Sequence, residues 1–370
     1  MSEWKEYKLG DVAEVKYGKA HQPLADGKIP AYGSGGLMRY VERALYEDES
    51  ILIPRKGTLN NVMYKSEPFW TVDTMFYTRL NKQIIVPKYL FYQLSTIDFA
   101  NMNVGSAVPS MTVPVLNDID ITVPPLPEQT AIASVLSSLD NKIDLLHRQN
   151  ATLEKMAETL FRQWFVEEAK EEWENGKLGD IAAVQNGFAF KSKEFKTNGT
   201  NRVIKIKNIS GGIIDIENTD YIENDVAEKT QERFKIITGD ILIAMTGAEI
   251  GKLGIVPKTI QNLWLNQRVG LLKEKYKGSK YLAYLQLKSE FGQDYIENTA
   301  TGSAQPNISG NAIENCEFPK ITEEKIKKYS LQIGELYDKV IFNLGQIRTL
   351  TALRDTLLPK LMSGEIRVEM

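Results

Sequence analysis

The sequence repeats itself, and this repetition restricts the possible folds more than any other feature. The matched pairs, in chain order, are EWKEYKLGDVAEVKYGKA (3–20) with EWENGKLGDIAAVQNGFA (172–189), ESILIPRKGT (49–58) with GDILIAMTGA (239–248), PKYLFY (87–92) with SKYLAY (279–284), and GSAVPSMT (105–112) with GSAQPNIS (302–309). A chance recurrence of one loop would not reproduce several matches in one order. The chain is therefore expected to contain two copies of one structural unit.

Each copy begins with short strands. Alternating apolar residues follow the Gly-Asp pair of both copies, and such alternation predicts a half-buried strand. ILI at 51–53 and again at 241–243 predicts an apolar strand that ends in a glycine turn.

Each copy ends in a long helix. Pro127 is suited to the first helical position, and no glycine or further proline occurs before Phe165. Apolar residues recur there at steps of four and three over about five heptads, which predicts a coiled-coil seam with Asn150 as its polar interruption. From Thr322 the second copy shows the same seam, interrupted by Asn343 and Arg354, and Pro359 should bend or end that helix near its last turn.

The two helices are expected to pair antiparallel. Facing residues then have numbers that add to a constant, so setting Asn150 opposite Asn343 also sets Leu146 opposite Ile347. A buried asparagine pair would fix this register at some cost in stability. The alternative is that both asparagines face solvent or a partner subunit.

Two further consequences follow from this register. Leu139 falls opposite Arg354, which is a mismatch. The pseudo-two-fold axis falls near Arg148 and Gly345, where glycine would let the two backbones approach closely. At about 1.5 Å per residue the stretch 127–165 forms a ruler about 55–60 Å long, sufficient to hold two domains over successive major grooves of DNA.

The predicted fold class is α+β: two pseudo-repeated mixed α/β domains, each followed by a long helix, with the helices paired as an antiparallel coiled coil. The predicted segments are a first domain at 1–126, a central helix at 127–168, a second domain at 169–321, and a C-terminal helix and tail at 322–370. A duplicated, pseudosymmetric molecule suits a pseudosymmetric target such as duplex DNA.

The composition restricts the cellular location and the kinds of partner that we expect for this protein. Cys316 is the only cysteine, which excludes an internal disulfide and suits a reducing cytoplasm. No apolar run approaches the length of about 20 residues that spans a bilayer, and the first residues lack the order of a signal peptide. The net charge is −3, so a DNA-binding surface would have to be local. We expect a cytoplasmic protein with no membrane partner.

Catalytic motifs are missing. The only Pro-Pro pair, in VPPLP, lacks the preceding Asn or Asp and the following aromatic residue of an adenine methyltransferase. GAEIGKLG at 247–254 is one residue short of a phosphate loop and has Leu253 in place of Ser or Thr, so a glycine turn is favoured. His21 and His147 have no ligand spacing around them. We predict no catalytic residue, no metal and no cofactor.

Two segments of the helical regions are VPPLPEQTAIASVL (123–136) and LRDTLLPKLMSGEIRV (353–368). They resemble the central and the C-terminal helical regions of a known family, the specificity subunits of type I restriction-modification systems. KLGDIAAVQNGFAFKS (177–192), GDILIAMTGAEIGKLGIV (239–256) and LNQRV (265–269) resemble their target recognition domains. In the first domain WTVDTMFY (70–77) stands where the second has WLNQRVGL (264–271).

The resemblance implies a non-catalytic DNA-recognition subunit. Each domain would recognise one half of a bipartite site in double-stranded DNA, and the helix pair would set the spacing. Two methyltransferase subunits would dock on the helices, and restriction subunits are a further partner in this family.

Basic and amide residues around strand ends are the candidate DNA contacts, because forked donors can enter a groove. In the first domain these are Arg55, Lys56, Asn60 and Asn61; in the second they are Lys191, Lys193, Lys205, Lys207, Asn208, Asn266, Gln267 and Arg268. For any single residue, a solvated charge or a turn amide is an equally good interpretation. The alternative function is a non-catalytic coiled-coil scaffold whose two domains bind proteins, and salt-dependent binding to duplex DNA would separate the two.

Overall fold

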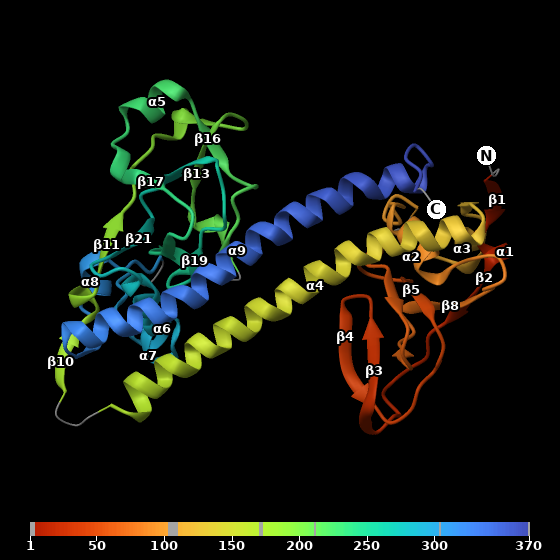
Figure 1. Ribbon diagram of the computed structural model, residues 1–370, viewed down its shortest axis with the longest axis horizontal. Helices are drawn as coiled ribbons and strands as arrows, with labels where there is room; N and C mark the ends of the chain where they lie inside the picture. Colours follow the sequence, from red (N-terminus) through yellow and green to blue (C-terminus); the bar gives the residue numbers. More distant parts are fainter. Residues whose placement is uncertain (1–3, 103–109, 170–172, 211, 303–304, 369–370) are drawn as a thin grey trace. The chain divides into compact units, whose positions relative to one another are not determined.

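The computed structural model describes residues 4–102, 110–169, 173–210, 212–302 and 305–368. The chain forms two compact units (Figure 1), one made of residues 1–142 with 350–370 and one of residues 143–349. Two long helices, α4 (Leu126–Arg162) and α9 (Glu323–Met362), contribute to both units. The unit boundaries therefore cut through the helices, and the predicted division into four segments remains a prediction. In the described part of the chain no helix is long and apolar enough to cross a membrane.

The first domain is bounded by a pair of strands. β1 (Lys5–Lys8) pairs antiparallel with β9 (Asp120–Val123), so the chain arrives beside the place where it leaves. Between them lie a four-stranded and a three-stranded sheet. In sheet order these are β2 (Ala13–Tyr17), β8 (Met75–Leu80), β5 (Ser50–Pro54) and β6 (Met63–Lys65), then β4 (Gly36–Val41), β3 (Asp26–Gly33) and β7 (Trp70–Thr71).

Short helices complete the first domain. They are α1 (Leu9–Val12), α2 (Pro87–Ser95) and α3 (Val113–Asn117). The core of this unit contains Ile51, Phe76 and Tyr89 together with Leu136 from α4 and Leu361 from α9. Apolar residues of both long helices are thus part of the core of the first domain. This accounts for the apolar seam in this part of each helix.

The second domain repeats the arrangement with added strands. β10 (Glu174–Lys177) pairs antiparallel with β22 (Glu317–Lys320), as β1 does with β9. A six-stranded sheet contains β11 (Ala182–Asn186), β21 (Val269–Glu274), β18 (Ile241–Ala244), β19 (Leu253–Ile255), β15 (Gly212–Ile214) and β14 (Ile209–Ser210). A five-stranded sheet contains β12 (Phe195–Lys196), β16 (Asp220–Ile222), β13 (Asn201–Ile204), β20 (Asn262–Leu265) and β17 (Lys235–Ile236).

Helices pack on these sheets. They are α5 (Asn224–Lys229), α6 (Ser279–Lys288), α7 (Glu290–Thr299) and α8 (Gly310–Glu314), with 3-10 turns η2 (Leu178–Asp180), η3 (Ser192–Glu194), η4 (Ile206–Asn208), η5 (Glu232–Phe234) and η6 (Gly247–Glu249). The core of this unit joins Ile241 and Leu282 to Phe161 near the end of α4 and to Val340 of α9. A π-helical turn, η1 (Gln163–Glu167), follows α4.

The duplication extends to single backbone hydrogen bonds. Gly18 N donates to Met75 O at 2.9 Å, and Gly187 N donates to Val269 O at 3.2 Å. In each domain one parallel strand pair sets a tryptophan, Trp70 or Trp264, opposite a buried apolar residue. The two domains therefore share one framework, and the predicted fold class is confirmed.

The long helices make polar contacts with each other inside each unit. In the second unit Asn343 Nδ2 donates to Asn150 Oδ1 at 2.9 Å, and both residues are buried. In the first unit Arg354 Nη1 lies 3.0 Å from Asp140 Oδ1, so the guanidinium has a carboxylate partner and does not remain a mismatch against Leu139. Partner numbers rise on one helix as they fall on the other, which is the antiparallel arrangement.

One expectation about the helices is wrong. A Cβ placed on Gly345 would meet Lys258 Cβ at 3.0 Å, and its nearest neighbours all belong to Lys258. Gly345 therefore makes room for the second domain and does not allow a close approach to Arg148, which is exposed and paired with Asp144 at 3.0 Å. The constant sum of facing residue numbers pairs positions along the two helices, but it does not say which side of its helix a residue faces.

Three other helix positions were singled out in the sequence, namely Leu146, Ile347 and Pro359. Leu146 is buried and Ile347 is half-buried, packed against the core of the second unit. Pro359 lies inside α9, which ends at Met362, within the last turn as expected.

Candidate nucleic-acid interface

In the first domain three loop segments converge beyond the end of β5. Arg55 N donates to Thr74 O at 2.8 Å, and Met111 N donates to Arg55 O at 2.9 Å. Lys56 and Ser110 form an isolated antiparallel bridge. The turn after β5, the loop before β8 and the end of the phrase GSAVPSMT are thus joined by backbone hydrogen bonds, which gives this surface a fixed frame.

The second domain builds the same frame. Met245 N donates to Arg268 O at 3.1 Å, and Ile308 N donates to Met245 O at 3.0 Å. Thr246 and Asn307 form the matching bridge. The ends of both repeated phrases therefore flank the turn and lead into a short helix, although their residues 105–109 and 303–304 lie outside the described residues.

Arg55 is held in place at this surface. Its Nη1 donates to Asp73 O at 3.0 Å, and its guanidinium lies 5.4 Å from the centroid of the Tyr17 ring. The half-buried Arg55 side chain is therefore orientated, whereas Lys56 beside it is exposed. An orientated guanidinium with several N–H groups suits a bidentate acceptor such as a base edge or a phosphate.

The two asparagines of this turn hold loops together. Asn60 Nδ2 donates to Asp98 Oδ1 at 3.0 Å, and Asn60 Oδ1 accepts from Ala100 N at 3.0 Å. Asn61 Nδ2 donates to Ser34 O at 2.7 Å. For Asn60 and Asn61 these contacts favour the turn-amide interpretation.

The candidates of the second domain fall into separate groups. Gln267 and Arg268 are exposed on the turn between β20 and β21, and Asn266 beside them is buried. Lys191 and Lys193 are exposed at η3. Of these, only the turn 266–268 is tied to the frame described above.

A third group is built around Asp220. Lys205 Nζ lies 2.9 Å and Lys207 Nζ 3.1 Å from Asp220 Oδ2. Partial burial raises the pKa of Asp220, but the two ammonium groups lower it further, so the net pKa is below its ordinary value. Asn208 is buried, accepts from Lys205 N and donates to Asn218 O, each at 2.9 Å. These residues stabilise the η4 turn.

Comparison with known proteins identifies the family to which the chain belongs. A family model described as "Type I restriction modification DNA specificity domain" matches residues 1–155 and 170–343. The chain belongs to this family. The prediction from the sequence motifs is therefore confirmed at the level of the family.

Relatives among the type I specificity subunits span the whole chain. The MjaIX specificity subunit of Methanocaldococcus jannaschii is 27% identical over an alignment 416 residues long, gaps included. The alignment covers 99% of this chain and 94% of the relative. The HindI specificity subunit of Haemophilus influenzae is 21% identical, with 99% and 100% covered. The crystal structure of a type I system S subunit from M. genitalium has a TM-score of 0.70 at 17% identity and covers 100% of this chain and 97% of its own, which supports the fold. The chain is thus a specificity subunit, a non-catalytic class.

Within this specificity subunit the two frames carry different side chains at matched positions. Arg55 and Lys56 of the first domain stand where the second has Met245 and Thr246, and Arg268 stands where the first has Thr74. The alignment of WTVDTMFY with WLNQRVGL already places Thr74 opposite Arg268, and the shared hydrogen bonds agree with it. Tyr17, which lies against Arg55, was not among the predicted residues.

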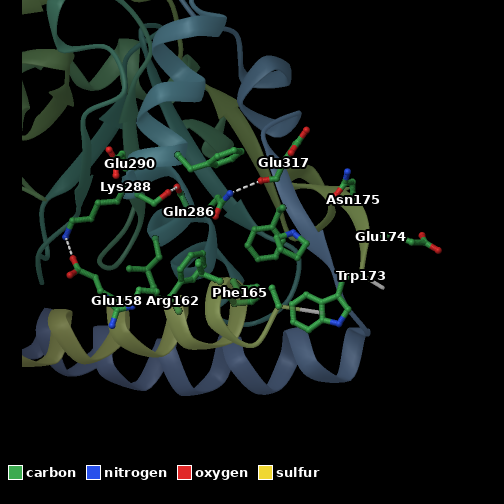
Figure 2. A pocket seen from close by; sticks show the side chains of 18 residues that line it. Glu158, Arg162, Phe165, Trp173, Glu174, Asn175, Gln286, Lys288, Glu290 and Glu317 are labelled. Carbon is green, nitrogen blue, oxygen red and sulfur yellow. Dashed lines mark hydrogen bonds and ion pairs between the residues drawn. The ribbon is translucent and has the colours of Figure 1, made fainter. Parts of the chain in front are cut away.

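The second unit of the specificity subunit also has a cavity of about 820 Å³ (Figure 2). Aromatic residues line it, among them Phe165 and Trp173. Lys288 Nζ lies 3.1 Å from Glu158 Oε1, and Gln286 Nε2 donates to Glu317 O at 2.8 Å. Among the described residues no group of three or more His, Cys, Asp and Glu side chains could hold a metal ion.

Proposed function

We propose that each domain of this specificity subunit recognises one half of a bipartite sequence in duplex DNA. The observation that supports this most is the duplicated frame that presents different side chains at matched positions. A common frame gives both domains one way to approach DNA, while different side chains allow each to select a different sequence.

Arg55 and Lys56 are the proposed contacts of the first domain, and Gln267 and Arg268 those of the second. Arginine donors match the two acceptors on the major-groove edge of guanine, and each such pair discriminates by about 1–3 kcal/mol. The net charge of −3 does not oppose this, because these cations are local to the two frames.

The helix pair is proposed to set the spacing between the two halves and to dock two methyltransferase subunits in the cytoplasm, with restriction subunits as further partners. A shallow hollow on one face of α4 supports docking, since it is lined by Ala151, Thr152, Lys155, Met156, Thr159 and Leu160. Met156 is 48% exposed there, so the hollow offers an apolar side chain that a docked subunit could cover.

Methylation mapping of DNA modified by the complex with a methyltransferase subunit tests the proposal. Arg55→Ala should relax one position in one half of the site, and Arg268→Ala one position in the other half, each by about 1–3 kcal/mol. Arg43→Ala, which removes an exposed arginine outside the frame, should leave the mapped sequence unchanged. If either frame variant weakened binding to all sequences equally, that arginine would be a phosphate contact and not a base contact.

A further inference from the structure

Two consecutive apolar residues are exposed at the start of β4. Leu37 is 51% and Met38 54% exposed, although a regular strand would turn them to opposite faces. The pairing with β3 is irregular at this point, because Leu37 lies opposite Tyr32 and Arg39 opposite Ala31, which leaves Met38 without an opposite residue. A β-bulge of this kind redirects side chains, and here it brings both apolar groups to the surface.

The tip of the β3–β4 hairpin (Figure 1) is attached to the frame of the first domain. Asn61 Nδ2 donates to Ser34 O at 2.7 Å. Gly57 has a φ of 86°, and a Cβ there would lie 2.9 Å from Ser34 Oγ. Because Gly57 directly follows Lys56, the hairpin tip belongs to the same surface as the turn that carries Arg55 and Lys56.

Met38 lies on the side of the hairpin that faces the loop before β8. A Cβ on Gly33 would lie 2.6 Å from Met38 Sδ and 3.6 Å from Val72 Cγ2. The thioether thus occupies space that only a glycine leaves open, close to the loop whose Thr74 accepts from Arg55 N. Apolar and cationic groups are therefore neighbours here.

We propose that Leu37 and Met38 contact the C5-methyl groups of thymines in the half-site of the first domain. The inference rests on the proposed function, since it needs DNA at this frame. Thymine methyls are the apolar groups that base pairs present in the major groove, and they lie beside acceptors and phosphates that match Arg55 and Lys56. The mixed chemistry of the surface matches this mixed chemistry of DNA.

The second domain also has a short hairpin, in which β14 pairs antiparallel with β15. After β13 its chain enters η4 and then β14, and Asn208 of η4 is buried and hydrogen bonded within the domain. In that hairpin Ile213 is 38% exposed whereas the next residue, Ile214, is buried, as in a regular strand. Two adjacent exposed apolar residues are therefore a feature of the first hairpin, and the contribution of Leu37 and Met38 should be confined to the first half-site.

The experiment uses the complex with its methyltransferase subunit and duplexes of the mapped site in which deoxyuridine replaces one thymine at a time. Loss of a single buried methyl should weaken binding about fourfold. We expect this loss at one or two thymines of the first half-site. Leu37→Ala or Met38→Ala should bind the unmodified duplex more weakly and no longer respond to deoxyuridine there.

Ile260→Ala, which removes a fully exposed apolar side chain of the second unit, should retain the complete response. The proposal is overturned if no deoxyuridine in the first half-site weakens wild-type binding, if the variants respond as the wild type does, or if that half-site contains no A·T pair. It is also overturned if the variants impair only assembly with the methyltransferase, which would make the hairpin a protein-binding surface. Absence of any sequence-specific binding by the wild type would instead contradict the proposed function.

Discussion

The facing amides of Asn343 and Asn150 are buried in the second unit and share one hydrogen bond. Asn150 Nδ2 and Asn343 Oδ1 have no hydrogen-bond partner among the described residues. Buried amide groups without partners cost stability, so this pair should favour one register at the expense of the free energy of folding.

Asn343→Leu should destabilise the protein by about 1–3 kcal/mol, because it leaves the whole Asn150 amide buried without its partner. Replacing both asparagines by leucine should recover most of that loss or exceed the wild type in stability. Urea denaturation of the two single variants and the double variant measures the coupling. If the loss of stability in the double variant equals the sum of the losses in Asn343→Leu and Asn150→Leu, the two amides do not interact.

Residue-scale prediction from the sequence depended on periodicity. The asparagines could be placed opposite each other because they interrupt otherwise regular seams. The surroundings of Gly345 could not be predicted, since Lys258 approaches it from a distant part of the chain. Likewise, the loop-holding roles of Asn60 and Asn61 depend on Asp98 and Ser34, which no local pattern connects to them.

At the scale of elements, the matched glycines after β2 and β11 lie very close to the backbone of a neighbouring segment in each domain. A Cβ on Gly18 would lie 2.0 Å from Val72 O, and one on Gly187 would lie 2.1 Å from Asn266 O. Both neighbours are backbone atoms, which cannot move aside without shifting a strand. Glycine is therefore required at these two positions by packing.

Gly187→Ala should destabilise the protein by about 2–4 kcal/mol through this clash. Gly35→Ala is the matched control, because no atom lies within 4 Å of the added Cβ, and it should change stability by less than about 0.5 kcal/mol. Thermal unfolding followed by calorimetry compares the two variants. An unchanged transition for Gly187→Ala would show that the strand ends are not closely packed.

Elements with strong patterns were predictable from the sequence, namely the long helices and the apolar strands that became β5 and β18. The short strands from β12 to β17 were not, because two to four residues carry too little periodicity to identify a strand. The bulge at Met38 was also invisible, since it depends on pairing with β3.

At the scale of the whole molecule, the two domains should select their half-sites independently. Exchanging residues 169–321 for the corresponding segment of another specificity subunit should change only one half of the methylated sequence, because each domain has its own core and frame. Methylation mapping of DNA modified by the hybrid complex provides the measurement. A simultaneous change in both halves would mean that the domains are not separate modules.

The paired boundary strands have a consequence for inheritance. β1 with β9, and β10 with β22, bring the two ends of each domain together before the chain continues. A domain can therefore gain or lose internal segments, as the additional strands of the second domain illustrate, while its two junctions keep the same separation. If each domain recognises its own half-site as proposed, recombination between related genes at the segments that encode these paired strands would produce a new specificity in one step.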